Sequence, residues 1–273
     1  MPHARITSPR NPQLKKVLKL RDPKEREASG LTIVEGLREL RRARQAGVDL
    51  KELFLCRDLL ENSLSESGIR EIESKETVVF EVSEEVFAKI SFGERREGLL
   101  AVVRPRILGL EDLKLPQKPL CCVVEGLEKP GNLGAILRSC DGVGAEGLLV
   151  CDGKTDIYNP NVIRASLGSV FSIKVVQTAN DLALKFLRDH KMKICVTSPQ
   201  ASRIYYQVDC TGPLAVVLGS EHQGASDFWM RHADTKVKIP MRGSVDSLNV
   251  AVTAGIVLYE ALRQRMQGRG QRA

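Results

Sequence analysis

The sequence has few aromatic residues, 4% of 273, and it lacks a long apolar run. A helix needs about 20 consecutive apolar residues to cross a bilayer, so we expect no membrane-spanning segment. Residues 1–5 also lack the apolar core that a secretory signal peptide requires. These absences argue against a membrane or secreted protein and predict a cytoplasmic one.

Metal-binding cysteine pairs are missing as well. No Cys-x-x-Cys occurs, and the four histidines are scattered along the chain. The seven cysteines are odd in number and lie mostly in apolar segments: Cys56, Cys121, Cys122, Cys140, Cys151, Cys195 and Cys210. We expect buried free thiols in a reducing compartment, with no metal site and no disulfide framework.

The net charge of +7 is unevenly placed. Residues 1–26 carry eight basic side chains against two acidic ones, and the tail from Arg263 adds four arginines and no acid. Basic ends on a mildly acidic body are typical of contact with a polyanion. Charge alone leaves open whether these residues only keep the termini solvated.

The first hundred residues alternate short apolar segments with charged helical ones. Strands are expected at residues 31–35, 53–56, 78–82 and 99–103. Helices are expected from Asn11, an N-cap followed by Pro12, to Leu20, after Gly36, and at 69–73 and 84–90. This alternation predicts a small α/β domain over residues 1–103, and three prolines among charged residues predict a linker at 104–119.

A second α/β alternation follows the linker and predicts another domain over residues 120–273. Strands are expected at 120–124, 148–151, 173–176, 193–197, 214–218 and 236–239. Helices are expected at 133–143, 160–167, 181–190 and 248–262, with Asn159 capping the second of them. Several strands are continuous apolar runs, which is the pattern of a parallel sheet buried on both faces.

Gly142-x-Gly144-x-x-Gly147 matches the dinucleotide-binding fingerprint in its spacing. That fingerprint works only where the glycines leave a strand and open a helix, because the helix N–H groups then meet the pyrophosphate. Here the glycines close a helix and lead into a strand. We interpret them as a helix stop and reject an NAD site.

Three other segments each follow an apolar strand and begin in a polar turn. The first holds Asn132 and Arg138, and the second, at 218–224, is rich in glycine and carries Glu221. Glycine lets a backbone approach a ligand closely. Because the carboxyl ends of parallel strands share one edge of a sheet, three such turns could wall a single pocket. Taken singly, each is also compatible with an ordinary turn.

The third segment follows a strand that stops at Pro240. Ser247 stands where a helix N-cap belongs, and the following helix is apolar around its whole axis. A helix of that kind is expected to be buried. Burial of the Asn249 amide in its first turn is unfavourable without partners, so we expect this residue to be anchored and functional.

In this order and spacing, the three segments resemble the motifs of the SpoU (TrmH) family of RNA 2′-O-methyltransferases, in the SPOUT superfamily, over about residues 120–265. The N-terminal half, through Arg26-x-x-x-Gly30-Leu31-x-x-Val34-Glu35-Gly36, resembles the ribosomal-protein-like RNA-binding domain often attached to this family. Two departures are mild: Asp246 stands where glutamate is common and Ala251 where serine is common. The implied fold is a small N-terminal α/β/α domain plus a SPOUT α/β domain with a deep C-terminal trefoil knot.

The resemblance implies S-adenosylmethionine as the methyl donor and an RNA ribose as the acceptor, with no metal required. The donor site would be formed by Thr197, Gly219, Glu221, Ile239, Met241, Ser247 and Leu248. The catalytic set would be Arg138, Asn249, Asn132 and Glu221. The RNA-binding set would be Arg10, Lys15, Arg26, Arg38, Arg41, Arg138 and Arg164, and a partner subunit could supply the last of these.

The resemblance gives the role of general base to Arg138. A guanidinium with a pKa above about 12 is a poor base, so our hypothesis is that it clamps the phosphate and stabilises the forming alkoxide. Such proteins are homodimers with the active site near the interface. Ala251, Ala254 and Gly255 would allow close approach of helices there, and packing within one subunit explains them equally well.

Two further readings stay open at this stage. The chain could be an RNA-binding or antibiotic-shielding protein with an inactive pocket, or a nucleotide-binding oxidoreductase. Ribosomal RNA is favoured over tRNA as the substrate by analogy with the attached domain. The target nucleotide cannot be read from the sequence.

Overall fold

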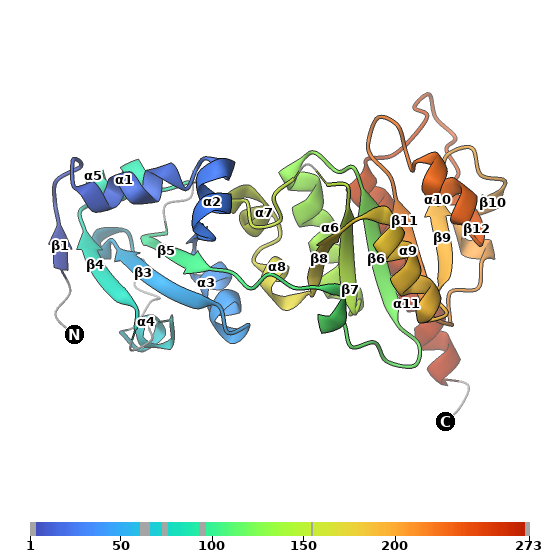
Figure 1. The fold of residues 1–273 in the computed structure, drawn as a ribbon, viewed down its shortest axis with the longest axis horizontal. Helices are drawn as coiled ribbons and strands as arrows, with labels where there is room; N and C mark the ends of the chain where they lie inside the picture. Colours follow the sequence, from blue (N-terminus) through green and yellow to red (C-terminus); the bar gives the residue numbers. More distant parts are fainter. Residues whose placement is uncertain (1–3, 61–65, 73–75, 93–96, 154, 271–273) are drawn as a thin grey trace. The chain divides into compact units, whose positions relative to one another are not determined.

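The computed structural model describes residues 4–60, 66–72, 76–92, 97–153 and 155–270. The chain divides into two compact units (Figure 1). Unit 1 comprises Met1–Arg106 and Tyr158–Ser172, and unit 2 comprises Ile107–Ile157 and Ile173–Ala273. The chain therefore leaves unit 1, returns to it once and leaves it again.

Unit 1 is built on a five-stranded mixed sheet with the order β1-β4-β3-β5-β2. The strands are β1 (Ala4–Ile6), β2 (Thr32–Glu35), β3 (Asp49–Leu55), β4 (Val78–Val82) and β5 (Leu99–Arg104). β5 is antiparallel to both of its neighbours, and the other pairs are parallel. The four strands predicted from the sequence are confirmed. β1 was not expected, because three residues are too few to show an alternating pattern.

The helices of unit 1 cover this sheet. They are α1 (Pro12–Lys19), α2 (Pro23–Ser29), α3 (Leu37–Gln45), α4 (Glu66–Ile72), α5 (Glu84–Ile90), α7 (Pro160–Ala165) and α8 (Ser169–Ser172). Asn11 caps α1 as predicted, because its Oδ1 accepts a hydrogen bond from the Gln13 N–H at 2.8 Å. The apolar side of α1, with Leu14 and Val17, then joins Phe87 of α5 in one buried cluster.

The segment Tyr158–Ser172 packs within unit 1, although the sequence pattern placed it in the second domain. The Thr32 hydroxyl of β2 donates a hydrogen bond of 2.7 Å to the Tyr158 carbonyl. Arg42 of α3 donates one of 3.2 Å to the Leu167 carbonyl. Asn159 caps α7, as expected. Helical periodicity predicts that a helix exists, but it does not say which sheet the helix covers.

Unit 2 contains a seven-stranded sheet with the order β10-β12-β9-β11-β6-β7-β8. The strands are β6 (Leu120–Glu125), β7 (Gly147–Cys151), β8 (Val175–Thr178), β9 (Lys193–Thr197), β10 (Arg203–Ile204), β11 (Leu214–Leu218) and β12 (Thr235–Lys238). Every neighbouring pair is parallel, which confirms the prediction from the continuous apolar runs. β8 begins two residues later than expected, and β10 was not expected.

Helices lie on both faces of this sheet (Figure 1). They are α6 (Pro130–Val143), α9 (Asn180–Asp189), α10 (Asp227–His232) and α11 (Val250–Gly270). On one face, Leu187 of α9 and Trp229 of α10 pack with strand residues in a large buried cluster. On the other face, α11 packs against both α6 and β11. No helix in the described part of the chain is long and apolar enough to cross a membrane. The trefoil knot stays a prediction.

The glycines that imitate a dinucleotide fingerprint have the role predicted for them. Gly144 ends α6 in the left-handed conformation, with φ +66°. The Ala145 N–H then donates to the Cys140 carbonyl at 2.9 Å, and Gly147 begins β7. These glycines stop a helix and enter a strand.

The segment expected to be a linker is instead partly packed. Leu110–Asp112 forms a short 3₁₀ helix, and Leu113 is buried in the core of unit 2. The first passage from unit 1 to unit 2 therefore falls between Arg106 and Ile107 rather than across residues 104–119.

All seven cysteines are free and buried, as predicted. Burial raises the pKa of Cys121, Cys151 and Cys195 to about 12. These thiols are therefore protonated at physiological pH and behave as small apolar side chains.

Candidate active site

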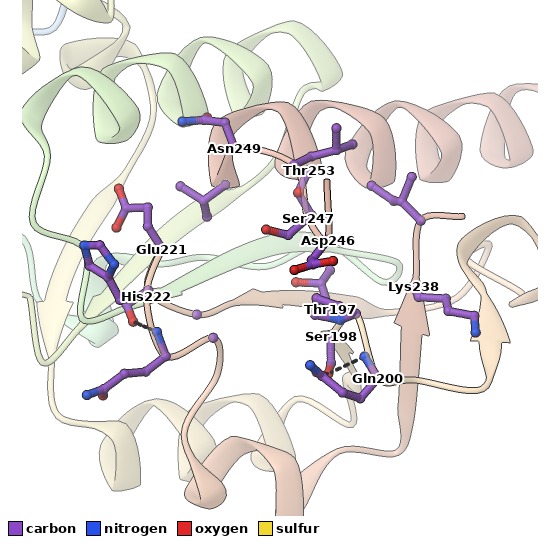
Figure 2. Close-up of a pocket in the computed structure, with 18 of the residues that line it drawn as sticks. Thr197, Ser198, Gln200, Glu221, His222, Lys238, Asp246, Ser247, Asn249 and Thr253 are labelled. Atoms are coloured by element: carbon purple, nitrogen blue, oxygen red, sulfur yellow. Dashed lines mark hydrogen bonds between the residues drawn. The ribbon is translucent and has the colours of Figure 1, made fainter. Parts of the chain in front are cut away.

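A cavity of about 500 Å³ opens at the carboxyl ends of β9, β11 and β12 in unit 2 (Figure 2). All seven residues proposed for the donor site line it: Thr197, Gly219, Glu221, Ile239, Met241, Ser247 and Leu248. In Figure 2, Glu221 and His222 lie together on the left, and Ser198, Gln200 and Lys238 lie to the right of them. The structure therefore brings the second and third motifs together around one space, within the size range of small-molecule sites.

The wall formed by the second motif is a closed turn. The backbones of Ser220 and Gly224 exchange hydrogen bonds of 3.1 and 3.0 Å. Gly224 has a φ of +68°, which favours glycine. A Cβ on Gly219 would overlap the backbone of Gly224 and Ala225, so the two limbs of the turn can meet only if residue 219 has no side chain. We call residues 219–225 the glycine ring.

A hydrogen-bonded network joins the three motifs. The Asn132 Nδ2 donates to the Glu221 Oε1, and the Asn249 Nδ2 donates to the Asn132 Oδ1 at 3.1 Å. Asn132 thus acts as a link, because its amide donates to one partner and accepts from the other. Both donors in this network are uncharged side-chain amides.

Asn249 has a second role that the sequence reading gave to Ser247. Its Oδ1 accepts the Ala251 N–H at 2.9 Å, and its carbonyl accepts the Thr253 N–H at 2.9 Å, so Asn249 is the N-cap of α11. The helix begins at Val250 rather than Leu248. The expectation that Asn249 is buried is wrong for the single chain, since its side chain is exposed. As predicted, the Asn249 side chain is anchored: its hydrogen bonds to Asn132 and to the Ala251 N–H fix its orientation.

The prediction that α11 is buried on all sides is also wrong for the single chain. Val252, Tyr259 and Met266 are 50%, 50% and 64% exposed. Their spacing of seven residues places them on one side of the helix. Ala254 is fully buried, and Gly255 faces the Ser139 hydroxyl of α6, so these small residues serve packing within one subunit.

Arg138 lies on α6, six residues after Asn132, and is exposed. It is not among the residues that line the cavity. Within the described ranges its guanidinium has no hydrogen-bond or ion-pair partner. At a rise of about 1.5 Å per residue, its Cα lies roughly 9 Å along the helix from that of Asn132. Arg138 is thus free to contact a ligand that extends beyond the cavity.

The predicted RNA contacts of unit 1 fall into three groups: exposed cations without an ion pair in the described residues, exposed cations in an ion pair, and one buried arginine. Arg10, Lys15 and Arg164 are exposed. Arg38 and Arg41 are exposed but form ion pairs with Glu39 at 3.0 Å and Glu71 at 3.3 Å.

Arg26 contradicts its prediction, because it is only 5% exposed. Its Nη1 donates to the carbonyls of Leu20 and Arg21, where α1 ends. Arg26 therefore stabilises the end of α1 through these carbonyl contacts.

Several cavity residues were missed by the sequence reading: Lys129, Ser198, Gln200, His222, Lys238, Asp246 and Thr253. Most of them lie beside a predicted site residue, and that adjacency is the signal that could have found them. Within the described ranges, no three His, Cys, Asp or Glu side chains are grouped closely enough to hold a metal ion.

Comparisons with known proteins agree with this geometry. Residues 119–259 match the SpoU rRNA Methylase family, and residues 11–101 match the MRM3-like substrate binding domain. The 23S rRNA (guanosine-2′-O-)-methyltransferase RlmB of Pseudomonas putida is 37% identical over 176 residues, covering 62% of this chain and 71% of that protein.

Two crystal structures extend the likeness over nearly the whole chain. An RNA 2′-O ribose methyltransferase is 39% identical with a TM-score of 0.83, covering 96% of this chain and 99% of the other. An AdoMet-bound rRNA methyltransferase from Sinorhizobium meliloti is 27% identical with a TM-score of 0.86, covering 95% and 97%.

Proposed function

The chain belongs to the SpoU rRNA methylase family, and from this premise we propose that it transfers a methyl group from S-adenosylmethionine to a ribose 2′-oxygen of ribosomal RNA. The observation that carries the proposal is the Glu221–Asn132–Asn249 network, because it joins all three motifs beside one cavity. An oxidoreductase is disfavoured, since the glycines that suggested one end a helix.

The cavity has the chemistry that the methyl donor requires. Ile239, Met241 and Leu248 supply apolar surface for a flat base beside the backbone of the glycine ring. Hydrogen bonds to an uncharged base can come from backbone groups there. When bound, the donor supplies an electrophilic methyl on a sulfonium. Glu221 adds a carboxylate to the lining of the cavity.

Arg138 is proposed as the catalytic cation. Its exposed guanidinium, unpaired in the described part of the chain, can clamp the phosphate beside the target ribose. It can also stabilise the oxyanion that develops as the 2′-hydroxyl loses its proton. Asn249 then orients the hydroxyl through its amide, while Asn132 and Glu221 hold Asn249 in place.

RNA binding is proposed to involve unit 1, since the substrate-binding match falls there. Arg10 and Lys15 are exposed cations of unit 1 without an acidic partner in the described ranges, so they are candidates for phosphate contacts. Such contacts position the substrate without reading its sequence. Arg164 on α7 is a further candidate.

A homodimer is proposed because α11 presents a bare apolar stripe of Val252, Tyr259 and Met266. Exposed apolar side chains along one side of a helix are typical of an interface, and a second copy of the chain would bury them. Sedimentation analysis of the wild type and of Val252→Glu/Met266→Glu tests this, since two buried charges would shift a dimer to monomer. The trefoil knot and a cytoplasmic location are proposed with the same family.

The function is tested by incubating the purified protein with radiolabelled S-adenosylmethionine and ribosomal RNA that lacks its modifications. We expect label in 23S rRNA at a ribose 2′-oxygen, mapped by resistance to alkaline cleavage. A guanosine is the first position to examine, since the RlmB relatives methylate guanosine. Label in tRNA instead would support the runner-up substrate, and RNA binding without transfer would support a non-catalytic protein.

A further inference from the structure

Glu125, the last residue of β6, is a buried carboxylate that the proposed mechanism does not use. It is 7% exposed and forms no ion pair within the described part of the chain. An ionised carboxylate in this position is unfavourable unless hydrogen-bond donors surround it. Its partners therefore show what it holds.

Three donor groups converge on Glu125. The Ser226 N–H donates to Oε2 at 2.8 Å, and the Ser226 hydroxyl donates to Oε1 at 2.6 Å. The Asn180 Nδ2 donates to Oε1 at 2.8 Å. Asn180 is itself fixed, because the Trp229 indole N–H donates to its Oδ1 at 2.6 Å.

Ser226 directly follows the glycine ring and is the N-cap of α10. The ring is closed by its own Ser220–Gly224 hydrogen bonds, and in the described part of the chain two side-chain hydrogen-bonded contacts join it, or the Ser226 that follows it, to other segments. One contact joins Glu125 to Ser226, the residue directly after the ring, which we call its stem. The other is Glu221 to Asn132, on the cavity side.

We propose that Glu125 is a positioning residue for the methyl-transfer reaction: it fixes the stem of the glycine ring so that Glu221 reaches Asn132 and the ring backbone lines the donor cavity. The inference rests on the proposed function. It adds to that function a residue outside the three cavity walls that sets affinity for the donor.

The position requires a carboxylate rather than an amide. Each of the three neighbouring groups, two from Ser226 and one from Asn180, is a donor here, and an ionised carboxylate only accepts. Glutamine has the same shape, but its NH₂ group would face a donor whichever way the amide is turned. Glu125→Gln therefore removes at least one bond and loosens the stem without leaving a cavity.

The experiment compares three variants with the wild type: Glu125→Gln, Ser226→Ala and the double variant. Donor affinity is measured by calorimetry with S-adenosylmethionine, and hydrogen–deuterium exchange is followed for residues 219–225. We expect Glu125→Gln to raise the donor Kd about 10-fold and to speed exchange in the ring. Ser226→Ala should have a smaller effect, because its backbone N–H bond remains. The double variant should be no worse than Glu125→Gln, since both changes act on one contact.

Asp234→Asn is the matched control. Asp234 is also held by several donors, from Arg188 and from the Ile194 N–H, but it precedes β12 and so lies at the opposite end of the strands from the cavity. We expect this control to lower the Tm with a donor Kd within about twofold of the wild type.

The proposal is overturned if Glu125→Gln binds the donor as the wild type does. It is also overturned if Asp234→Asn weakens donor binding equally, because general destabilisation would then explain both. If the wild type itself binds no S-adenosylmethionine, the proposed function fails, and the exchange measurement still decides. Faster exchange in Glu125→Gln that is confined to residues 219–225 supports the positioning role of Glu125, and unchanged exchange overturns it.

Discussion

The two units use polar side chains in opposite ways. In unit 2 the amides and carboxylates of the site are bonded to one another, as in the Glu221–Asn132–Asn249 network. In unit 1 the side chains best suited to RNA, Arg10 and Lys15, lie exposed without an acidic partner in the described ranges. Unit 2 is therefore organised to hold a small ligand in one geometry, whereas unit 1 offers charge that adapts to a large polyanion.

Arg138 breaks this division, because it lies in unit 2 yet is exposed like the cations of unit 1. A guanidinium that binds neither a carboxylate nor a backbone carbonyl is expected to find its partner in the substrate. Side chains that are hydrogen-bonded within the protein are thus expected to position the site, and exposed cations without a partner are expected to contact the substrate. The predictions below test that difference, beginning with the largest effect.

Arg138→Ala should lower the rate of methyl transfer by about 100-fold or more, because it removes the cation that stabilises the developing oxyanion. Donor affinity should hardly change, since Arg138 does not line the cavity. Single-turnover kinetics and calorimetry measure the two effects separately. Near-normal turnover in this variant would remove Arg138 from the mechanism.

Gly219→Ala should weaken donor binding by roughly 30-fold, because the new Cβ forces the two limbs of the glycine ring apart. Gly212→Ala is the matched control: no atom lies within 4 Å of a Cβ placed there. Calorimetry with the donor and thermal melting of both variants provide the measurement. Equal affinities in the two variants would show that the ring does not shape the site.

Replacing Arg10 and Lys15 with glutamine should weaken RNA binding by about 5- to 10-fold and reduce its salt dependence. The matched pair is Arg38→Gln/Arg41→Gln, whose cations are already engaged by Glu39 and Glu71. That pair should lose about twofold. Fluorescence anisotropy over a range of salt concentrations measures both, and a larger loss for the ion-paired arginines would reverse our assignment.

The smallest expected effect is on acid stability. Burial alone would raise the pKa of Asp234, but hydrogen bonds from Arg188 and the Ile194 N–H outweigh burial and lower it. A lowered folded-state pKa gives stability that is present above about pH 4 and is lost as the pH falls through the folded value. Between pH 6 and pH 3 the wild type should therefore lose a few degrees more in Tm than Asp234→Asn does. Asp181→Asn, an exposed carboxylate, is the control and should follow the wild type.

Much of unit 2 could be predicted from its sequence because its signals are local. Continuous apolar runs identified the parallel strands, and glycine-rich turns after them identified the cavity walls. Asn132 and Glu221, which the sequence assigned to one pocket, hydrogen-bond each other in the structure, since the carboxyl ends of parallel strands share one edge of a sheet. The cap of α11 was misassigned because Ser247 and Asn249 are both good N-cap residues, and only the hydrogen bonds distinguish them.

What the sequence could not show depends on long-range packing. Arg26 carries the same charge as its exposed neighbours, and only the end of α1 determines that it is buried. The apolar residues all around α11 predicted burial, but they do not say whether this chain or a second copy covers Val252 and Met266. The destination of residues 158–172 is a choice between two sheets, which periodicity does not encode.

The return of Tyr158–Ser172 to unit 1 makes that unit discontinuous: three covalent crossings, not one, connect it to the rest. A fragment that begins after residue 103 or 106 would lack β2 and α3, against which α7 and α8 pack, and the buried Val162, Ile163 and Val170 would lose that cover. Such a fragment would expose an apolar surface and aggregate, and its failure to bind RNA would say nothing about unit 1. The modules of this enzyme can be dissected by point substitution, or by excising residues 158–172 together with the N-terminal part, but not by a single cut.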